Sequence, residues 1–342
     1  MWRLQDRPFL AVAATLVVVT LTFLIMRPKP RRPVASRPSD KNLVSHVVVR
    51  CVDLEKSLRF YQAIGFLEAS RTEASILLSL PQGSTYKPFL LFQQVDAKIP
   101  LPSSNWHAAM AGYGRVAFVV PSVQTYVERM KEEFGLAPIA DPITDTPKDK
   151  EGKPLHRITL AAWRDPDGVI VEVIENNDFK MRALLATFHA FGAFQYPIWL
   201  HCNINATNYD RTWAAFQDLG FEMENDYGRV VNKLYQSLAI PDPGIAKKVA
   251  LIKAKHDAFH VDLIEWDLIE WENSKTDLPR EGLPQRGLCS MAVVLRGEGG
   301  VPKSWKENGA EFEMDYPSPL GSASVQEVLD PDGISVQLVR YK

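Results

Sequence analysis

Residues 46–66 read HVVVRCVDLEKSLRFYQAIGF and join a strand-like run to an amphipathic helix. The run at 46–51 is rich in β-branched valine, which favours an extended strand. Asp53 then stands at a helix N-cap, and Gly65 suits the left-handed position that ends a helix. Between them the apolar residues recur with helical spacing, at Leu54, Leu58, Tyr61 and Ile64. The stretch therefore predicts a strand followed by a three-turn helix.

The same pattern returns 155 residues later. Residues 208–221 read NYDRTWAAFQDLGF, again with an N-cap residue, Asn208, and a closing glycine, Gly220. His201 opens the strand-like run before this helix, as His46 opens the first one. The chain is therefore built from an internal repeat.

A second repeated signature divides the chain further. DPDGVIVE at 165–172 recurs as DPDGISVQ at 330–337, a tight turn that starts a strand. RVAFVV at 115–120 begins another strand–helix pattern, and a strand at 289–295 followed by a poorer helix near 303–308 begins the last.

These patterns predict an α+β fold of four βαβββ units in two tandem halves. The expected halves are residues 42–177 and 198–342, joined by a linker at 178–197.

With these motifs the chain resembles the vicinal oxygen chelate (VOC) superfamily, which includes glyoxalase I, extradiol dioxygenases and bleomycin-resistance proteins. The resemblance covers residues 42–342. It implies two tandem glyoxalase-like domains whose paired units curl into a cup around a divalent metal, Fe, Mn, Ni or Zn. Open coordination positions would let that metal act as a Lewis acid or bind dioxygen. The family shares a scaffold and differs in chemistry.

In the family, the first and last strands of each unit supply the metal ligands. Carried over to this chain, the resemblance implies metal ligands at His46, Glu172 and His201, with Asp262 and Gln337 as weaker candidates. The two pairings of the units give different sites. If each half closes its own cup, His46 lies with Glu172; if the second unit pairs with the third, Glu172 and His201 gather beside Arg115, and His46 faces Gln337.

Arg115 departs from the family pattern, because many members have a histidine there. Arginine has no lone pair and cannot ligate a metal. The position near Leu90 is apolar, and Ser290 replaces histidine in the other half. Two roles stay open for Arg115. It could bind a substrate carboxylate together with Arg50, or pair with Glu172 and replace the metal.

The resemblance implies a metal-dependent enzyme acting on a small oxygenated organic acid or ring compound, most like a ring-cleaving dioxygenase in its four-unit layout. Glu172 and Arg115 would be catalytic, and Arg50 and Arg115 would bind the substrate. The missing histidine favours an isomerase or lyase of the same superfamily instead. A third alternative is a non-catalytic small-molecule-binding protein that resembles the bleomycin-resistance proteins.

Residues 1–41 differ in composition from the rest of the chain. They carry eight Lys and Arg against two Asp, a charge of +6; because the whole chain carries -2, residues 42–342 carry -8. The run FLAVAATLVVVTLTFLIM at 9–26 has no charge, Gly or Pro. At about 1.5 Å per residue it is long enough for one transmembrane helix, followed by a basic, Pro-rich spacer. A cleaved signal peptide is the alternative, but its apolar region is usually shorter and ends at a small-residue site. The heavier positive flank follows the span, which predicts a cytosolic folded part, with a mitochondrial membrane as an alternative.

The overall composition excludes two other classes of protein. A net charge of -2 without a concentrated basic face argues against a dedicated nucleic-acid binder. Three widely spaced cysteines without a CxxC motif argue against a disulfide framework or a cysteine zinc site. The expected partners are a small molecule and, through the N-terminal helix, a membrane.

Overall fold

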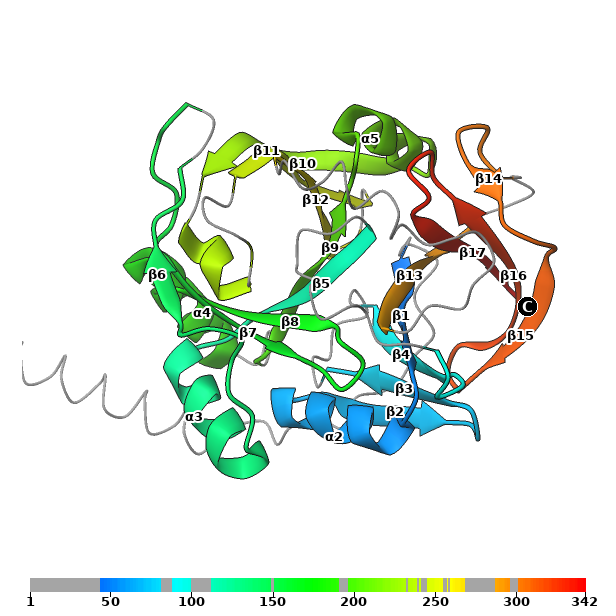
Figure 1. Cartoon of the computed structure of the whole chain (residues 1–342), viewed down its shortest axis with the longest axis horizontal. Coiled ribbons are helices and arrows are strands. Elements are labelled where there is room, and N and C mark those ends of the chain that lie inside the picture. Colours follow the sequence, from blue (N-terminus) through cyan, green and yellow to red (C-terminus); the bar gives the residue numbers. More distant parts are fainter. Residues whose placement is uncertain are drawn as a thin grey trace, which may run out of the picture.

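A computed structural model describes residues 44–80, 88–99, 112–148, 151–190, 196–231, 233–238, 240, 245–254, 257, 259–267, 287–295 and 301–342. The chain forms two mixed β-sheets with few helices (Figure 1). The predicted membrane span at 9–26 and its spacer lie outside the described residues. Among the described helices, none is long and apolar enough to cross a membrane.

The first sheet joins the beginning of the chain to its end. Its early strands are β1 (Val44–Cys51), β2 (Leu67–Arg71), β3 (Ser75–Ser79) and β4 (Phe89–Gln94). Its late strands are β13 (Gly287–Val294), β14 (Lys306–Glu307), β15 (Phe312–Tyr316), β16 (Gly321–Leu329) and β17 (Ser335–Tyr341). The strand order is β14-β16-β17-β13-β1-β4-β3-β2, with β15 paired to β16.

The second sheet takes the middle of the chain. Its strands are β5 (Gly112–Val119), β6 (Ile143–Asp145), β7 (Ile158–Arg164), β8 (Ile170–Asn176), β9 (Ile198–Asn205), β10 (Phe221–Val231), β11 (Ile245–Ala254) and β12 (His260–Trp266). Their order is β10-β11-β12-β9-β5-β8-β7-β6. In the described part of the chain the α-helices are α2 (Leu54–Ile64), α3 (Val123–Phe134), α4 (Phe179–Ala190) and α5 (Tyr209–Asp218), and a 3-10 helix, η2 (Lys233–Leu238), follows β10.

The sheets pair the predicted units across the chain. The first unit shares a sheet with the fourth through β1 and β13, and the second shares a sheet with the third through β5 and β9. Of the two pairings that the sequence leaves open, the cross-chain one is therefore confirmed. Neither sheet corresponds to one of the predicted halves, 42–177 and 198–342, because each half contributes one unit to each sheet. The domain limits themselves stay a prediction.

The repeated helices form as predicted. Asp53 caps α2 by accepting a hydrogen bond from the Lys56 amide at 2.9 Å, and Asn208 caps α5 by accepting one from the Arg211 amide at 3.0 Å. Gly65 ends α2 with a φ of 127°, a conformation that side chains with a Cβ rarely adopt.

The prediction of a helix near 303–308 is wrong. A turn closed by the Trp305 amide and the Pro302 carbonyl leads instead into β14. The Trp305 indole is buried and donates to the Ala215 carbonyl at the end of α5. This tertiary contact outweighs a weak local helical preference.

The two DPDG turns fasten each sheet to a helix of the other. The Asp167 carboxylate accepts hydrogen bonds from the Ser57 hydroxyl at 2.7 Å and the Val52 amide at 3.1 Å, at the start of α2. In the repeat, Asp332 accepts from the amides of Thr207 and Asn208 at the start of α5. The units within each half are therefore joined by these turns, whereas the sheets join units from different halves.

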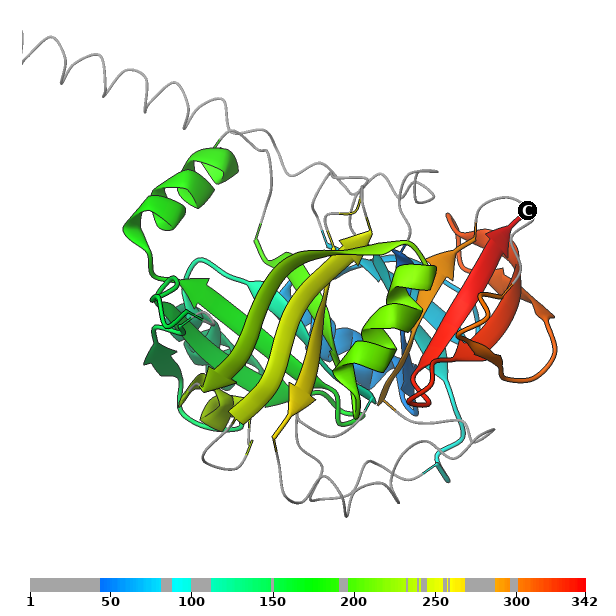
Figure 2. The same cartoon turned by 90° about the horizontal axis from the view of Figure 1, so that it is seen from above.

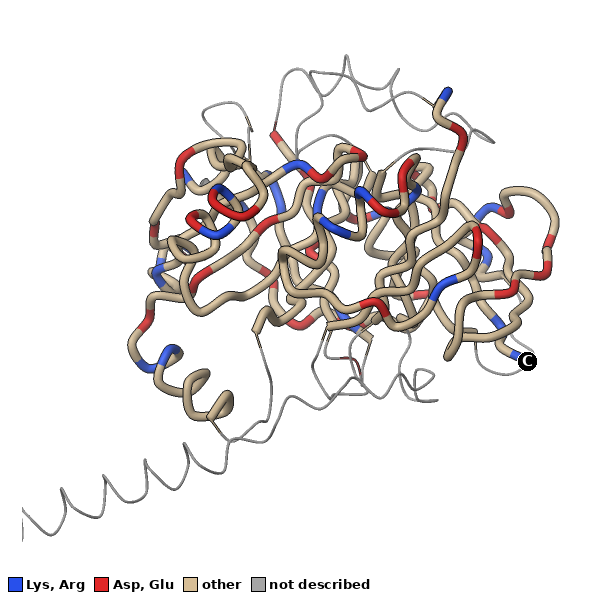
Figure 3. The backbone as a smooth tube through the Cα atoms, turned by 90° about the horizontal axis from the view of Figure 1, so that it is seen from below, with Lys and Arg blue, Asp and Glu red and all other residues tan. Residues whose placement is uncertain are grey.

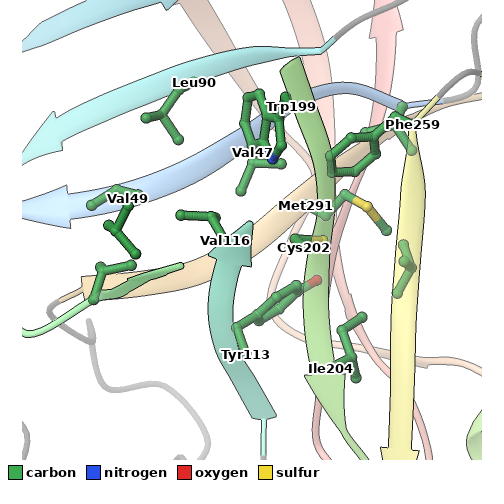
Figure 4. Close-up of a cluster of buried hydrophobic side chains, with 14 of the residues drawn as sticks. Val47, Val49, Leu90, Tyr113, Val116, Trp199, Cys202, Ile204, Phe259 and Met291 are labelled. Atoms are coloured by element: carbon green, nitrogen blue, oxygen red, sulfur yellow. The ribbon is translucent and has the colours of Figure 1, made fainter. Parts of the chain in front are cut away.

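The main core lies between the two sheets and the helices. Figure 4 shows side chains of β1, β13, β5 and β9 meeting there, among them Val47, Met291, Val116 and Trp199. Strand side chains alternate between the two faces of a sheet. Residues next to these core positions therefore point to the opposite, concave face of each sheet.

Replacing Asp167 with Ala is expected to lower the free energy of unfolding by about 2 kcal/mol, because buried donors at the start of α2 lose their acceptor. Urea denaturation measures the change. Asp141→Ala, at an exposed aspartate, is the control and should change stability by less than about 0.5 kcal/mol. Equal stability of the two variants would show that the turn does not hold the helix.

Candidate functional site

Four polar side chains from four adjacent strands meet on the concave face of the second sheet. They are Arg115 on β5, Glu172 on β8, His201 on β9 and Asp262 on β12. In the register of the sheet, Ala117 lies between Glu172 and His201. Each of the four side chains belongs to a residue that is at most 6% exposed. The cross-chain pairing of the units thus builds this cluster, which is called the Arg115 cluster below.

The guanidinium of Arg115 lies between two carboxylates. Its Nε donates to Glu172 Oε2, and one Nη donates to Asp262 Oδ2 at 2.9 Å. Burying three charges is costly unless they are paired and hydrogen-bonded to one another. The arginine therefore supplies the positive charge that both carboxylates require.

His201 adjoins the same carboxylate. Its Nε2 lies 3.8 Å from Asp262 Oδ2. Burial, together with the positive charge of Arg115, lowers the pKa of His201 well below its usual value. The ring is therefore neutral at pH 7 and offers one donor and one acceptor. Within the described part of the chain, both ring nitrogens and the second Nη of Arg115 have no hydrogen-bond partner.

The carboxyl groups hold protons more tightly than usual. Burial raises the pKa of Asp262 to about 6, although the nearby charge of Arg115 opposes the shift. Burial also raises the pKa of Glu172, again against the effect of Arg115. The cluster thus contains a carboxyl group that exchanges a proton close to neutral pH, a property that is common at functional sites.

The helix η2 lies on the same face of the sheet. Figure 1 shows it, in yellow-green, inside the curve of the second sheet. Its Tyr235 is buried, and the ring packs edge-on against Trp266 at 4.7 Å between centroids. Leu234 and Leu238 join the same apolar cluster. The surroundings of the charged groups are therefore largely apolar.

The corresponding face of the first sheet has become a hydrophobic core. His46 is fully buried, its Nδ1 lies 2.8 Å from the Ser45 hydroxyl, and its ring packs edge-on against Tyr316. Burial lowers the pKa of His46 to about 3, so the ring is neutral. The Tyr316 hydroxyl donates to Gln337 at 3.5 Å.

Several predicted site residues are not brought together. His46 and Gln337 lie in the first sheet, and Glu172 and His201 lie in the second. Arg50 lies on β1 opposite Gly287, so it is also in a different sheet from Arg115. Leu90 belongs to the main core (Figure 4).

Two residues of the site have only a weak signal in the sequence. Asn203 pairs in register with both Arg115 and Asp262, and its amide donates to the Asp262 carbonyl at 2.9 Å. Its position two residues after His201 could have indicated that it shares the same face. Tyr235 lies in a connection between strands, where no periodic pattern indicates it.

The Arg115 cluster does not fit the divalent metal that the resemblance implies. Glu172, His201 and Asp262 are suitable donors, but a cationic group that cannot ligate lies between the two carboxylates. Among the described residues, no three His, Cys, Asp or Glu side chains are arranged to hold a metal ion. The Fe, Mn, Ni or Zn expected from the resemblance therefore has no matching donor set here.

Comparison with known proteins identifies the fold. No family model and no curated protein sequence matches the chain. Among solved structures, a glyoxalase I variant from Zea mays superposes with a TM-score of 0.51 at 13% identity, covering 87% of this chain and 94% of its own. A glyoxalase/bleomycin resistance protein/dioxygenase from Alicyclobacillus acidocaldarius has 17% identity and a TM-score of 0.29, covering 42% of this chain and 98% of its own. The chain has a glyoxalase-like fold, as the sequence motifs predict.

Replacing Asp262 with Asn is expected to remove a pH dependence of stability. The folded-state pKa of Asp262, about 6, lies above the ordinary value of 3.8. At pH values between these two, the folded chain binds a proton that the unfolded chain has released. Relative to the variant, the wild type should lose about 3 kcal/mol of unfolding free energy as pH rises from about 4 to about 6. Urea denaturation at a series of pH values measures this difference, and a constant difference would contradict the buried, proton-holding carboxyl.

Proposed function

We propose that the concave face of the second sheet binds a small oxygenated organic compound without a metal ion. The observation that carries the proposal is the pairing of the Arg115 guanidinium with both Glu172 and Asp262. The positive charge that a metal would bring to these carboxylates is already present in the side chain.

The unpartnered nitrogens favour an oxygenated ligand. Buried polar atoms nearly always have a hydrogen-bond partner in folded proteins. The second Nη of Arg115 is a donor, and neutral His201 offers a donor and an acceptor. A carbonyl or carboxylate oxygen and a neighbouring hydroxyl would satisfy them, and Tyr235 with Trp266 would contact an apolar chain or ring.

This arrangement favours one of the three predicted functions over the others. A metal-dependent dioxygenase, or a metal-dependent isomerase or lyase, would need Arg115 to leave the carboxylates and expose three donors. Small-molecule binding, as in the alternative that resembles bleomycin-resistance proteins, uses the cluster as it stands. We therefore place metal-independent binding first.

Replacing Arg115 with His is expected to create a metal site. The variant has two carboxylates without their cation, so it should be about 3–5 kcal/mol less stable than the wild type in the presence of a chelator. Ni²⁺ or Zn²⁺ should restore this stability, because the variant then has two histidines and two carboxylates at adjacent positions. Thermal melting with and without metal, together with titration calorimetry, measures both effects.

Arg115→Lys is the matched control, because lysine keeps the positive charge and supplies no ligand at neutral pH. It should gain no metal binding. Wild-type protein that purifies with an equimolar, tightly held Fe, Mn, Ni or Zn at Glu172, His201 and Asp262 would contradict the proposal.

A second function is favoured by the proton affinity of Asp262. A carboxyl group with a pKa of about 6 can remove a proton from a carbon next to a carbonyl at neutral pH. The free Nη of Arg115 could then hydrogen-bond the carbonyl oxygen as negative charge develops on it. Such a reaction belongs to a metal-free isomerase or lyase.

Solvent deuterium exchange distinguishes catalysis from binding alone. With pyruvate and dihydroxyacetone as probes in D₂O, a proton-transferring protein should speed the loss of the C–H signal in proton NMR. Asp262→Asn should lower that rate by at least about 100-fold, whereas Asp141→Asn should not. Exchange no faster than without protein, combined with ligand-dependent chemical shifts, would support binding and reject this second function.

A further inference from the structure

The helix α4 is apolar yet has no buried side chain. It reads FKMRALLATFHA, and eight of its 12 residues are apolar. Phe179 is 83% exposed, Leu184 45% and Phe188 43%. A helix that is apolar on most of its circumference is normally covered by other protein or by lipid.

The helix projects from the body of the protein. Figures 2 and 3 show α4 standing away from both sheets. Its first turn is held by Asp178, which accepts hydrogen bonds from the amides of Met181 and Arg182. The linker predicted at 178–197 therefore contains a helix that starts at a fixed point, just after β8.

The charge of α4 is opposite to that of the body. Residues 179–197 contain no Asp or Glu and include Lys180 and Arg182, whereas residues 42–342 carry -8. In Figure 3 the helix carries blue positions (Lys and Arg) and no red ones (Asp and Glu). Basic side chains next to a membrane surface are attracted to anionic lipid headgroups, and the exposed apolar side chains of α4 would add the hydrophobic part of such a contact.

We propose that α4 lies flat on an anionic lipid bilayer, with its apolar side chains at the boundary between headgroups and acyl chains. At about 1.5 Å per residue, the helix is about 18 Å long and too short to cross a hydrocarbon core of about 30 Å. Forty-three residues precede Val44, and they include the uncharged run at 9–26. A membrane span there would bring the folded body to the surface where α4 makes its contact. This proposal is independent of the function proposed for the Arg115 cluster.

Depth-dependent quenching in the full-length chain tests the proposal. An environment-sensitive fluorophore is placed on α4 through Ala186→Cys, and at a control site on β15 through Glu313→Cys, which is exposed. The native cysteines at 51, 202 and 289 are buried, so labelling is directed to the introduced thiol. The protein is reconstituted into phosphatidylcholine vesicles with about 30% phosphatidylserine, prepared with and without brominated acyl chains.

The probe at position 186 should shift to shorter wavelength and be quenched by brominated lipid at least about threefold more than the probe at position 313. Phe179→Glu combined with Leu184→Glu should abolish this excess, and neutral vesicles should reduce it. Equal quenching at both sites would overturn the proposal. A blue-shifted probe at 186 that brominated lipid does not quench would also overturn it, because α4 would then be covered by the N-terminal segment or by a second copy of the chain.

Discussion

The buried guanidinium of Arg115 is the interaction on which the second sheet and its chemistry depend. It joins carboxylates from β8 and β12, two strands that lie on either side of the central pair β5 and β9. Without it, the concave face would hold two negative charges in an apolar surrounding, at a cost of several kcal/mol. Because arginine cannot ligate a metal, the side chain that balances the two carboxylates is also the basis for the proposal that this face binds a small molecule without a metal.

The two sheets show how one repeated unit can take two different roles. The DPDG turns are alike in both halves, and each fixes the start of a helix through an aspartate. The concave faces differ. In the first sheet, His46 packs as a neutral core residue against Tyr316, whereas the second sheet keeps its charged groups and balances them with one another. Buried charged side chains are therefore concentrated on one concave face of a duplicated scaffold.

Local features of the fold could be predicted from the sequence. Strand–helix repeats, N-caps at Asp53 and Asn208 and closing glycines depend on short-range physics and appear as predicted. The pairing of the units could not be predicted, because the repeated units present similar apolar faces whichever partner they meet. For that reason the meeting of His201 with Glu172 and Arg115 was one of two open alternatives. The position of η2 depends on tertiary packing alone and could not be predicted.

The most direct test of the central claim is a high-resolution crystal structure of the purified protein in the presence of excess Ni²⁺ or Zn²⁺, with anomalous scattering data. The account predicts continuous density for the Arg115 guanidinium between Glu172 and Asp262, and no anomalous peak at the cluster. An anomalous peak coordinated by Glu172, His201 and Asp262, with the Arg115 side chain turned away, would contradict it.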